Sequence, residues 1–361
     1  MFSEEDEYGE LQVITGGLFG RKITLNFVTV NDGFVVIPTG KWIEDIKIFP
    51  VVSINGKIYE AEFKDLYLFK EVFIRKYGME HYLKYFSGAE EAVLFKPYSG
   101  DGDYSYDAIG RYFDHISQHY IKGIQENKVQ TLMRQTVIEL LSKTISDGNT
   151  VLDLGSGPNS EILQIDKNIS VMEVDVSKKM IEISKKNNVN TKMNVKYLLM
   201  RSIDDIEGQY DIIFSTFGFL NIESIKNIRK IINEHLKKGG YFIGTYMNKF
   251  CLSDVLLSLL MGKFEYIRER ISGKLSANFS RYGILSFPRG PGFLREIGLD
   301  SIILKNGMCT ILPPYNYIRL NRWLEKFPLI YQLDRILSHL PLVSEYSDFI
   351  MFIGKKGYNC L

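Results

Sequence analysis

An apolar run that ends in a glycine turn carries the most specific chemistry in this sequence: residues 151–159 read VLDLGSGPN. Gly155 and Gly157 have no Cβ atom, so the backbone can turn sharply there and approach a ligand closely. Asp153 lies just before the turn, at the carboxyl end of a predicted strand, where open α/β sheets bind their ligands. Because its carboxylate repels a pyrophosphate and attracts a cation, the pattern favours a ligand with an ammonium group.

A second acidic residue, Asp175, ends the next predicted strand, VMEVD, about 20 residues beyond the glycines. An acidic side chain at this place can accept hydrogen bonds from both hydroxyls of a ribose. The two signals together indicate a ligand site more strongly than either does alone.

The elements that must position these residues alternate between helix and strand, which predicts a doubly wound α/β sheet. The apolar runs VLDL and DIIF are typical of interior parallel strands. We expect helices at 107–122, 128–145, near 160, 177–188 and 222–237, and strands at 150–154, 170–174, 194–200, 210–214 and 240–246. A mostly helical stretch, 250–298, precedes further strands at SIIL and FIMFIG, and we expect it to form a lid or a substrate pocket.

Four motifs in this order resemble those of the class I S-adenosylmethionine-dependent methyltransferases: VLDLGSGPN, VDVS, QYDIIFSTFG and LKKGGYFIG. The resemblance covers about residues 107–356 and implies a Rossmann-like fold that binds S-adenosylmethionine. It implies that Asp153 and the backbone of Gly155, Ser156 and Gly157 hold the methionine part, and that Asp175 holds the ribose. The other cofactor-binding residues that it implies are Val176, Ser202 and Ile203, which would flank the adenine, and Ser215.

Two positions depart from the family pattern. Asn159 replaces the third glycine of the turn, which is tolerable because asparagine adopts left-handed backbone angles more readily than other non-glycine residues. Arg201 stands where many relatives have an acid that faces the adenine amino group, so we expect neighbouring backbone to make that contact.

Three residues of the predicted helix 107–122 are candidates for catalysis. His115 and His119 lie four residues apart on one helix face, and either could deprotonate a hydroxyl or hold a phenolate. The alternative is a solvated pair on an exposed face. Tyr112 belongs to a YFD segment similar to the YD that precedes the first motif in relatives, where the ring borders the cofactor; its alternative is core packing.

The sequence favours a small, apolar methyl acceptor over nucleic acid. Residues 215–221 lack the Asn/Asp-Pro-Pro-Tyr/Phe signature of similar enzymes that methylate amino groups, and we interpret LPPY at 312–315 as a turn. A net charge of +1, from 44 basic and 43 acidic residues, creates no strong attraction to nucleic acid. The aromatic residues that suggest an aromatic or isoprenoid acceptor are Phe217, Phe219, Phe250, Phe287, Phe293, Tyr315 and Tyr317.

Residues 1–97 are expected to form a separate, mostly β unit. The β-rich runs LQVIT, ITLNFVTV, FVVIPT, PVVSI and KIYEAEF are separated by turn signals, and two helical stretches, 66–75 and 79–86, precede a last strand at 92–96. Residues 98–105 have the composition of a linker, and the methyltransferase-like unit then covers 106–361.

This first unit resembles, weakly, the split β-barrel deazaflavin-dependent nitroreductases, through Gly20-Arg21-Lys22 and the stretch from Trp42 to Val52. Arg21 and Lys22 could bind a cofactor phosphate, but Ile23-Thr24 shortens the loop expected after them. The unit is therefore either a barrel kept for packing or homodimerisation, or a second site that binds deazaflavin or flavin. For the whole protein, a third possibility is a non-catalytic subunit that binds the cofactor and assists a partner.

The remaining features indicate a cytoplasmic protein. The three cysteines, Cys251, Cys309 and Cys360, are scattered and form neither a disulfide framework nor a metal-binding pair, so no metal is expected. The acidic N-terminus lacks the apolar stretch of a secretory signal. The most apolar helical candidate, 250–261, contains Asp254 and is well short of the roughly 20 residues that span a bilayer.

Overall fold

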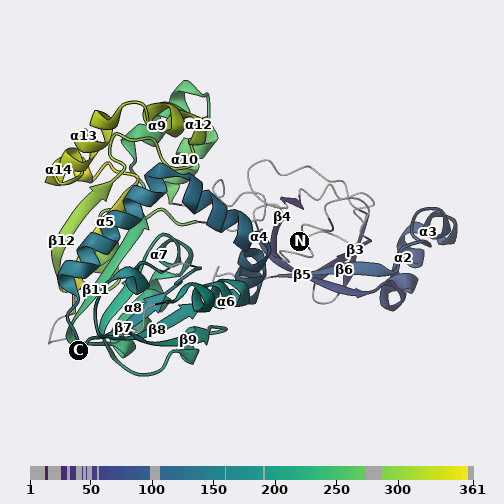
Figure 1. Cartoon of the computed structure of the whole chain (residues 1–361). Coiled ribbons are helices and arrows are strands. Elements are labelled where there is room, and N and C mark those ends of the chain that lie inside the picture. Colours follow the sequence, from purple (N-terminus) through teal and green to yellow (C-terminus); the bar gives the residue numbers. More distant parts are fainter. Residues whose placement is uncertain are drawn as a thin grey trace. The chain divides into compact units, whose positions relative to one another are not determined.

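A computed structural model describes residues 13–14, 26–30, 33–37, 43, 46, 51–54, 57–97, 106–158, 160–189, 192–273 and 286–356 (Figure 1). The chain divides into two compact units. The first comprises Met1–Tyr112 and Phe279–Leu285, and the second comprises Phe113–Asn278 and Ser286–Leu361. Each unit is described by itself below.

The first unit contains a six-stranded antiparallel sheet with the order β1-β4-β5-β6-β3-β2. Its strands are β1 (Val13–Ile14), β2 (Phe27–Val30), β3 (Gly33–Val36), β4 (Val51–Ile54), β5 (Lys57–Asp65) and β6 (Glu91–Pro97). Alternate residues of β2, β3 and β6 supply two apolar clusters, because successive side chains of a strand point to opposite faces. The second cluster also takes apolar residues from η1 (Leu66–Phe69), α2 (Lys70–Tyr77) and α3 (Met79–Tyr85).

The strands and helices predicted between residues 57 and 97 are confirmed. The split barrel stays a prediction, because the strand pairings run from β1 to β2 without closing the sheet within the described part of the chain. Arg21, Lys22 and Trp42, and the predicted linker 98–105, lie outside the described residues. The boundaries predicted for the domains likewise stay predictions.

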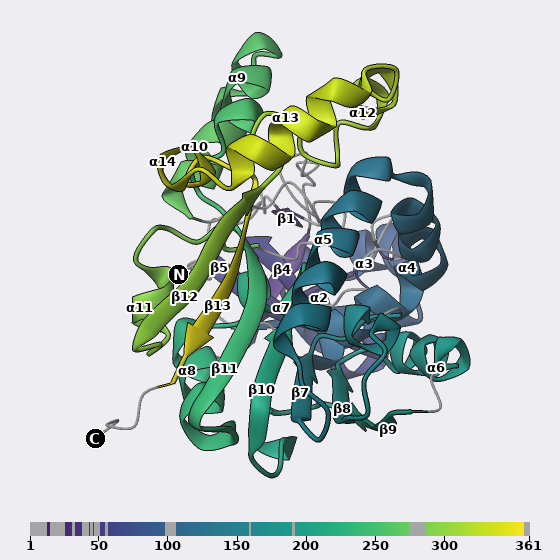
Figure 2. The ribbon, with the colours of Figure 1, turned by 60° about the vertical axis from the view of Figure 1, so that its left-hand side comes forward.

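The second unit is built on a seven-stranded sheet with the order β12-β13-β11-β10-β7-β8-β9 (Figure 2). Its strands are β7 (Thr150–Leu154), β8 (Ser170–Asp175), β9 (Asn194–Leu199), β10 (Tyr210–Ser215), β11 (Leu236–Met247), β12 (Ser301–Met308) and β13 (Phe349–Lys355). Strands β7 to β11 are parallel, and β13 runs antiparallel to both of its neighbours. The strand order reverses at β7, so the crevice for a ligand is expected at the carboxyl ends of β7 and its neighbours. The predicted Rossmann-like fold is confirmed.

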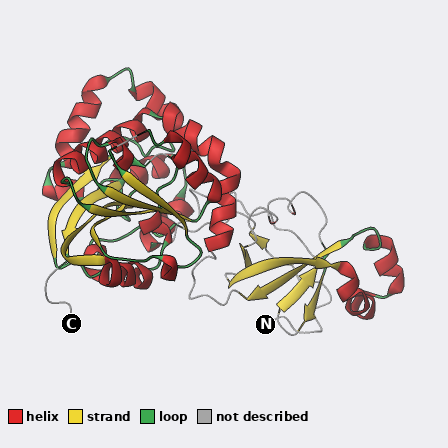
Figure 3. Ribbon diagram, turned by 60° about the horizontal axis from the view of Figure 1, so that its bottom comes forward, coloured by secondary structure: helices red, strands yellow, loops and turns green. Residues whose placement is uncertain are grey.

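Helices lie on both sides of this sheet (Figure 3). They are α4 (Tyr106–Glu126), which starts in the first unit, α5 (Lys128–Thr144), α6 (Lys178–Asn187), α7 (Phe219–Ile222) and α8 (Ile225–His235), with single 3₁₀ turns at η2 (Glu161–Gln164) and η3 (Ile203–Asp205). Helix α5 buries Val129, Met133, Val137 and Leu141 against the sheet, at the i, i+4 spacing of one helix face. The crossover from β7 to β8 contains only η2, where the sequence suggested a helix.

Two helical insertions form a cap, which we define as α9 (Leu252–Leu260), α10 (Phe264–Ser272), α12 (Ile318–Leu324), α13 (Pro328–Ser338) and α14 (Pro341–Ser344). Figures 1 and 2 both show these helices together beyond one end of the sheet. The first insertion, which also contains α11 (Phe293–Glu296), lies within the helical stretch predicted at 250–298, whereas the helices between β12 and β13 were not predicted. The chain leaves the carboxyl ends of β11 and β12 to enter the cap, so the cap lies at the same sheet edge as the glycine turn.

A buried ion cluster, here called the cap anchor, fixes the cap to the sheet. It consists of Arg270 on α10, Asp254 on α9 and Asp348 next to β13, with exposed side-chain fractions of 1%, 0% and 2%. Arg270 pairs with Asp254 and, at 2.7 Å, with Asp348, and it also donates to the backbone oxygen of Asn248. No helix among the described residues is long and apolar enough to cross a membrane.

Candidate functional site

The glycine turn follows the carboxyl end of β7 and is hydrogen-bonded to the carboxyl end of β8. Gly155 and Gly157 have φ angles of +70° and +64°, in the left-handed region that favours glycine. A Cβ atom on Gly155 would lie 3.1 Å from the Cβ of Phe219, so the position is also sterically tight. The backbone N–H of Gly155 donates to Val174 O at 2.8 Å, and that of Gly157 donates to Asp175 Oδ2 at 2.9 Å. These hydrogen bonds hold the turn against the end of β8, so Asp153 and Asp175 lie on either side of it.

Three buried carboxyl groups, Asp153, Glu173 and Asp175, surround this turn, and we call them the acidic centre. Asp153 and Glu173 are register partners on neighbouring strands and so lie on the same face of the sheet. Ser160 donates to Asp153, and the hydroxyl of Ser184 donates to Glu173 at 2.5 Å. None of the three carboxyl groups forms an ion pair with a described residue, so only neutral donors hold them.

Burial is the main cause of altered acidity in the acidic centre. It raises the pKa of Asp153 well above its usual range, and the charge of Glu173 adds to this. It raises the pKa of Glu173 to about 7, and that of Asp175 to about 6, although backbone N–H groups of Ser177 and Gly157 lower the latter. A nearby cation would favour the ionised forms of all three groups. The centre therefore fits a cationic ligand.

The hydroxyl of Ser156 supports a ligand at the same turn. Its oxygen is buried and has no hydrogen-bond partner among the described residues, which is unusual for a buried polar atom. Ser215 differs, because its fully buried hydroxyl donates to Leu154 O at 2.9 Å. A cofactor contact from Ser215 would therefore come from its backbone.

The residues predicted to flank the adenine lie just beyond β8 and β9. Ser202 caps η3 by accepting from the N–H of Asp204 at 3.2 Å, and the adjacent Ile203 is 9% exposed. Arg201 donates to Val176 O at 3.2 Å, so this departure from the family pattern links the two predicted adenine-flanking segments. The cofactor roles of Val176, Ser202 and Ile203 stay predictions.

Helix α4 carries the predicted catalytic residues. His115 is exposed and Tyr112 is buried, and the side chain of His119 lies outside the described part of the chain. The helix is fixed to the cofactor end of the sheet by Asp114, which accepts from Ser177 Oγ at 2.6 Å and from Lys179 N at 2.8 Å. No contact tests the catalytic roles of the three predicted residues, so these roles stay predictions.

A polar cluster that sequence reasoning missed lies beside the acidic centre: Tyr120 on α4, Arg134 on α5, Glu161 on η2 and Thr216 after β10. Arg134 pairs with Glu161, and Thr216 Oγ1 donates to Glu161 at 2.9 Å. Burial raises the pKa of the Tyr120 phenol, Arg134 lowers it, and the charges of Glu161 and Asp175 raise it further. These residues are widely separated in the sequence and share no spacing, so no sequence signal identified them.

The end of β10 brings aromatic side chains to the same edge. Phe217 has a φ angle of +53°, a strained conformation for a bulky residue, and its N–H donates to Thr245 Oγ1 at 2.9 Å. The guanidinium of Arg134 lies 5.1 Å from the centre of the Phe217 ring. The other predicted aromatic residues do not form one pocket: Phe293 packs in the core against Tyr246, and Tyr317 donates to Asp254 in the cap.

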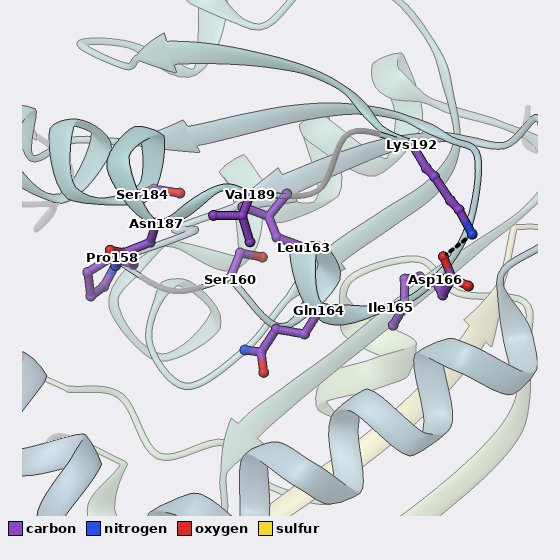
Figure 4. Close-up of a pocket in the computed structure, with 10 residues that line it drawn as sticks. All are labelled: Pro158, Ser160, Leu163, Gln164, Ile165, Asp166, Ser184, Asn187, Val189 and Lys192. Atoms are coloured by element: carbon purple, nitrogen blue, oxygen red, sulfur yellow. Dashed lines mark hydrogen bonds and ion pairs between the residues drawn. The ribbon is translucent and has the colours of Figure 1, made fainter.

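A cavity of about 590 Å³ lies behind the glycine turn, between η2 and the end of α6 (Figure 4). Ser160 and Ser184, which donate to Asp153 and Glu173, line this cavity, and the Lys192–Asp166 ion pair of 2.6 Å lies at its edge. The cavity lies beside η2, whose single turn covers less of the sheet at β7 and β8 than a full helix would. None of the predicted cofactor contacts lines the cavity, and no described group of side chains could hold a metal ion.

Comparisons with known proteins agree with this geometry. Residues 151–240 match a family described as a methyltransferase domain. An uncharacterized protein of Methanocaldococcus jannaschii is 28% identical over 70% of this chain and 92% of its own length. The ribosomal protein L11 methyltransferase of Dictyoglomus turgidum is 31% identical over 45% of this chain and 54% of its own.

Among solved structures, phosphoethanolamine N-methyltransferase 2 of Haemonchus contortus, in complex with S-adenosyl-L-methionine, is 14% identical, with a TM-score of 0.45. That match covers 87% of this chain and 72% of the other. The glycine turn, the two acidic strand ends and the family match agree: residues 151–240 of the second unit are similar to a methyltransferase domain.

Proposed function

We propose that this protein transfers the methyl group of S-adenosylmethionine to a small, apolar acceptor bound at the carboxyl ends of β7 and β10. The observation that carries the proposal is the acidic centre: three buried carboxyl groups that no described cation neutralises, placed around a left-handed glycine turn. A ligand with ammonium and sulfonium charges supplies the positive charge that this centre lacks.

The residues of the turn have distinct roles in this proposal. Asp153 and the backbone of Gly155 to Gly157 hold the methionine part, and Asp175 accepts hydrogen bonds from the ribose hydroxyls. The cofactor supplies an activated methyl group, so the protein mainly orients the two reactants and excludes water. The methyl carbon bonds to a lone pair of the acceptor while the sulfur keeps the electrons of the broken bond.

An acceptor that carries a proton needs a base, for which His115 and His119 remain the candidates. Tyr120 serves differently: its phenol is neutral near pH 7, burial raises its pKa further, and it can donate a hydrogen bond to an acceptor oxygen. Phe217, just after β10, and Phe219, the first residue of α7, support an apolar acceptor. The LPPY segment lies in the connection between β12 and α12, where Pro314 O accepts from Asn321, and this supports its interpretation as a turn.

The first test is Asp175→Ala, which removes the predicted ribose acceptor. S-adenosylmethionine should bind more weakly by about 1–3 kcal/mol in calorimetry, because two hydroxyls lose a charged partner in a partly desolvated site. Asp166→Ala is the matched control, since its carboxylate is 78% exposed and pairs only at the surface with Lys192. Equal affinity in folded Asp175→Ala and wild type would refute the ribose site.

The acceptor itself is best found by its product. Incubating the purified chain with labelled S-adenosylmethionine and a cell extract should place the label in an extractable, apolar small molecule. Gly155→Val should abolish this labelling, because the added side chain meets Phe219 and adopts a disfavoured φ. Label in protein or nucleic acid would contradict the proposed acceptor class.

A further inference from the structure

Two helices of the cap, α9 and α13, bury polar residues and expose apolar ones. On α9, Asp254 and Ser258 are both 0% exposed and face the protein interior. The opposite face of the helix presents Leu252, Leu256 and Leu260 at exposed fractions of 53%, 52% and 85%. A helix that faces water normally has the opposite arrangement, with its apolar residues inside.

Helix α13 repeats the same pattern. Asp334 and Ser338, again four residues apart, are buried, and Asp334 Oδ1 accepts from Ile311 N at 2.7 Å and from Leu312 N at 3.0 Å. The exposed residues at the i, i+4 and i+7 positions are Leu329, Leu333 and Ile336, at 74%, 49% and 61%. Two helices from different insertions therefore present leucine-rich faces outward.

The buried polar contacts hold both helices in this orientation. Asp254 pairs with Arg270 and accepts from the hydroxyls of Tyr266, at 2.6 Å, and Tyr317, at 2.9 Å. Rotating α9 to bury its leucines would expose or break these contacts, and a buried charge that loses its partner is strongly destabilising. The outward apolar faces are therefore a fixed part of the native fold.

Basic and aromatic residues border these faces on α12 and the turn after it. Arg319, Arg322 and Lys326 are exposed there, together with Trp323 at 53% and Phe327 at 48%, and the stretch 318–329 contains a single acidic residue. The centres of the Trp323 and Phe327 rings lie 4.9 Å apart. Leucine-rich faces with a border of tryptophan, phenylalanine and basic side chains are typical of elements that lie in a membrane interface.

We propose that the cap binds the surface of an anionic phospholipid bilayer. The leucine faces of α9 and α13 enter the boundary between headgroups and acyl chains, and Arg319, Arg322 and Lys326 contact lipid phosphates. Each helix is too short to cross the bilayer, so the association is peripheral. The basic border complements an anionic surface, which favours a bilayer over a second copy of a chain whose net charge is +1. This binding does not depend on the methyl transfer proposed above.

The test is flotation of the full chain with vesicles of phosphatidylcholine and phosphatidylglycerol in a ratio of about 2:1. The wild-type chain should float with these vesicles, and less so with pure phosphatidylcholine. The double variant Leu333→Glu, Ile336→Glu should lower the partition coefficient at least about tenfold, because it puts two charges into the apolar face. Val189→Glu is the matched control: Val189 is 86% exposed but lies outside the cap.

A second readout uses Trp323, since Trp42 is the other tryptophan of the chain. In Trp42→Phe, the fluorescence of Trp323 should shift to shorter wavelength when the same vesicles are added, because the ring enters a less polar environment. Arg322→Gln with Lys326→Gln should weaken binding to the anionic vesicles and reduce its dependence on salt.

Three results would overturn the proposal. The first is a wild-type chain that does not float with either vesicle, and the second is flotation that the α13 double variant leaves unchanged while its thermal unfolding stays that of wild type. The third is a wild-type dimer in light scattering that the double variant dissociates, without vesicle binding, because the faces would then be an interface between copies.

Discussion

The acidic centre and the cap anchor are both groups of buried carboxylates, but they differ in what neutralises them. Arg270 pairs with both Asp254 and Asp348 in the cap anchor. The acidic centre has only hydroxyl and backbone N–H donors among the described residues. Burial raises the pKa of Asp348 to about 6 while Arg270 lowers it, whereas Asp153 has no such cation. The comparison suggests that compensated charge holds the fold, and that uncompensated charge is kept for a cationic ligand.

The largest expected effect tests the structural side of this comparison. Arg270→Met should lower the free energy of unfolding by about 3–5 kcal/mol, because Asp254 and Asp348 stay buried without a cation. Urea denaturation measures this change. Arg335→Met is the control, since it breaks a surface pair with Glu139 whose side chains are 69% and 51% exposed and should cost about 1 kcal/mol at most. If Arg270→Met lowered the free energy of unfolding no more than Arg335→Met does, the distinction between the cap anchor and the acidic centre would be lost.

An intermediate effect concerns pH and the ligand side of the comparison. The ionised carboxylate of Asp175 is the stronger acceptor for the ribose hydroxyls, so affinity for S-adenosylmethionine should fall as pH drops below about 6, by about tenfold in total. Titrations by calorimetry between about pH 5 and pH 8 would measure this dependence. A flat profile would mean that the ligand does not need the charged form.

The stability of the ligand-free protein should respond to pH with the opposite sign. The raised pKa values of Asp175 and Glu173 mean that the folded state binds protons more tightly than the unfolded state between about pH 4 and pH 7. Their contribution to the free energy of unfolding is therefore lost as pH rises through this window.

The smallest expected effect is that of Glu173→Gln. At pH above about 7, this change removes a buried negative charge but keeps an acceptor for Ser184, so stability should rise by about 1 kcal/mol. The control is Asp166→Asn, in the exposed ion pair with Lys192, which should change the free energy of unfolding by no more than about 0.5 kcal/mol. Destabilisation by Glu173→Gln would show that its charge has a structural partner and would weaken the comparison.

Local patterns were sufficient to predict the cofactor end of the second unit. Each apolar run of residues 150–215 is a strand of the expected sheet, and the sharp turn expected at Gly155 and Gly157 is formed, with left-handed angles at both glycines. The same reasoning did not predict the helices of 318–344. Their exposed leucines and buried Asp334 and Ser338 reverse the usual pattern, so hydrophobic periodicity gives no reliable guide to which face is inside.

The sequence by itself determined the strand-turn-strand unit from Val151 to Asp175, because a glycine turn and its two acids act within 25 residues of each other. Only the tertiary structure decided which charges are neutralised. Arg134 pairs with Glu161, 27 residues away, and Arg270 pairs with Asp348, 78 residues away, and neither distance follows from a local pattern. Whether a buried carboxylate holds the fold or awaits a ligand depends on the charges that folding brings beside it, since electrostatic energy follows distance in space and the local dielectric.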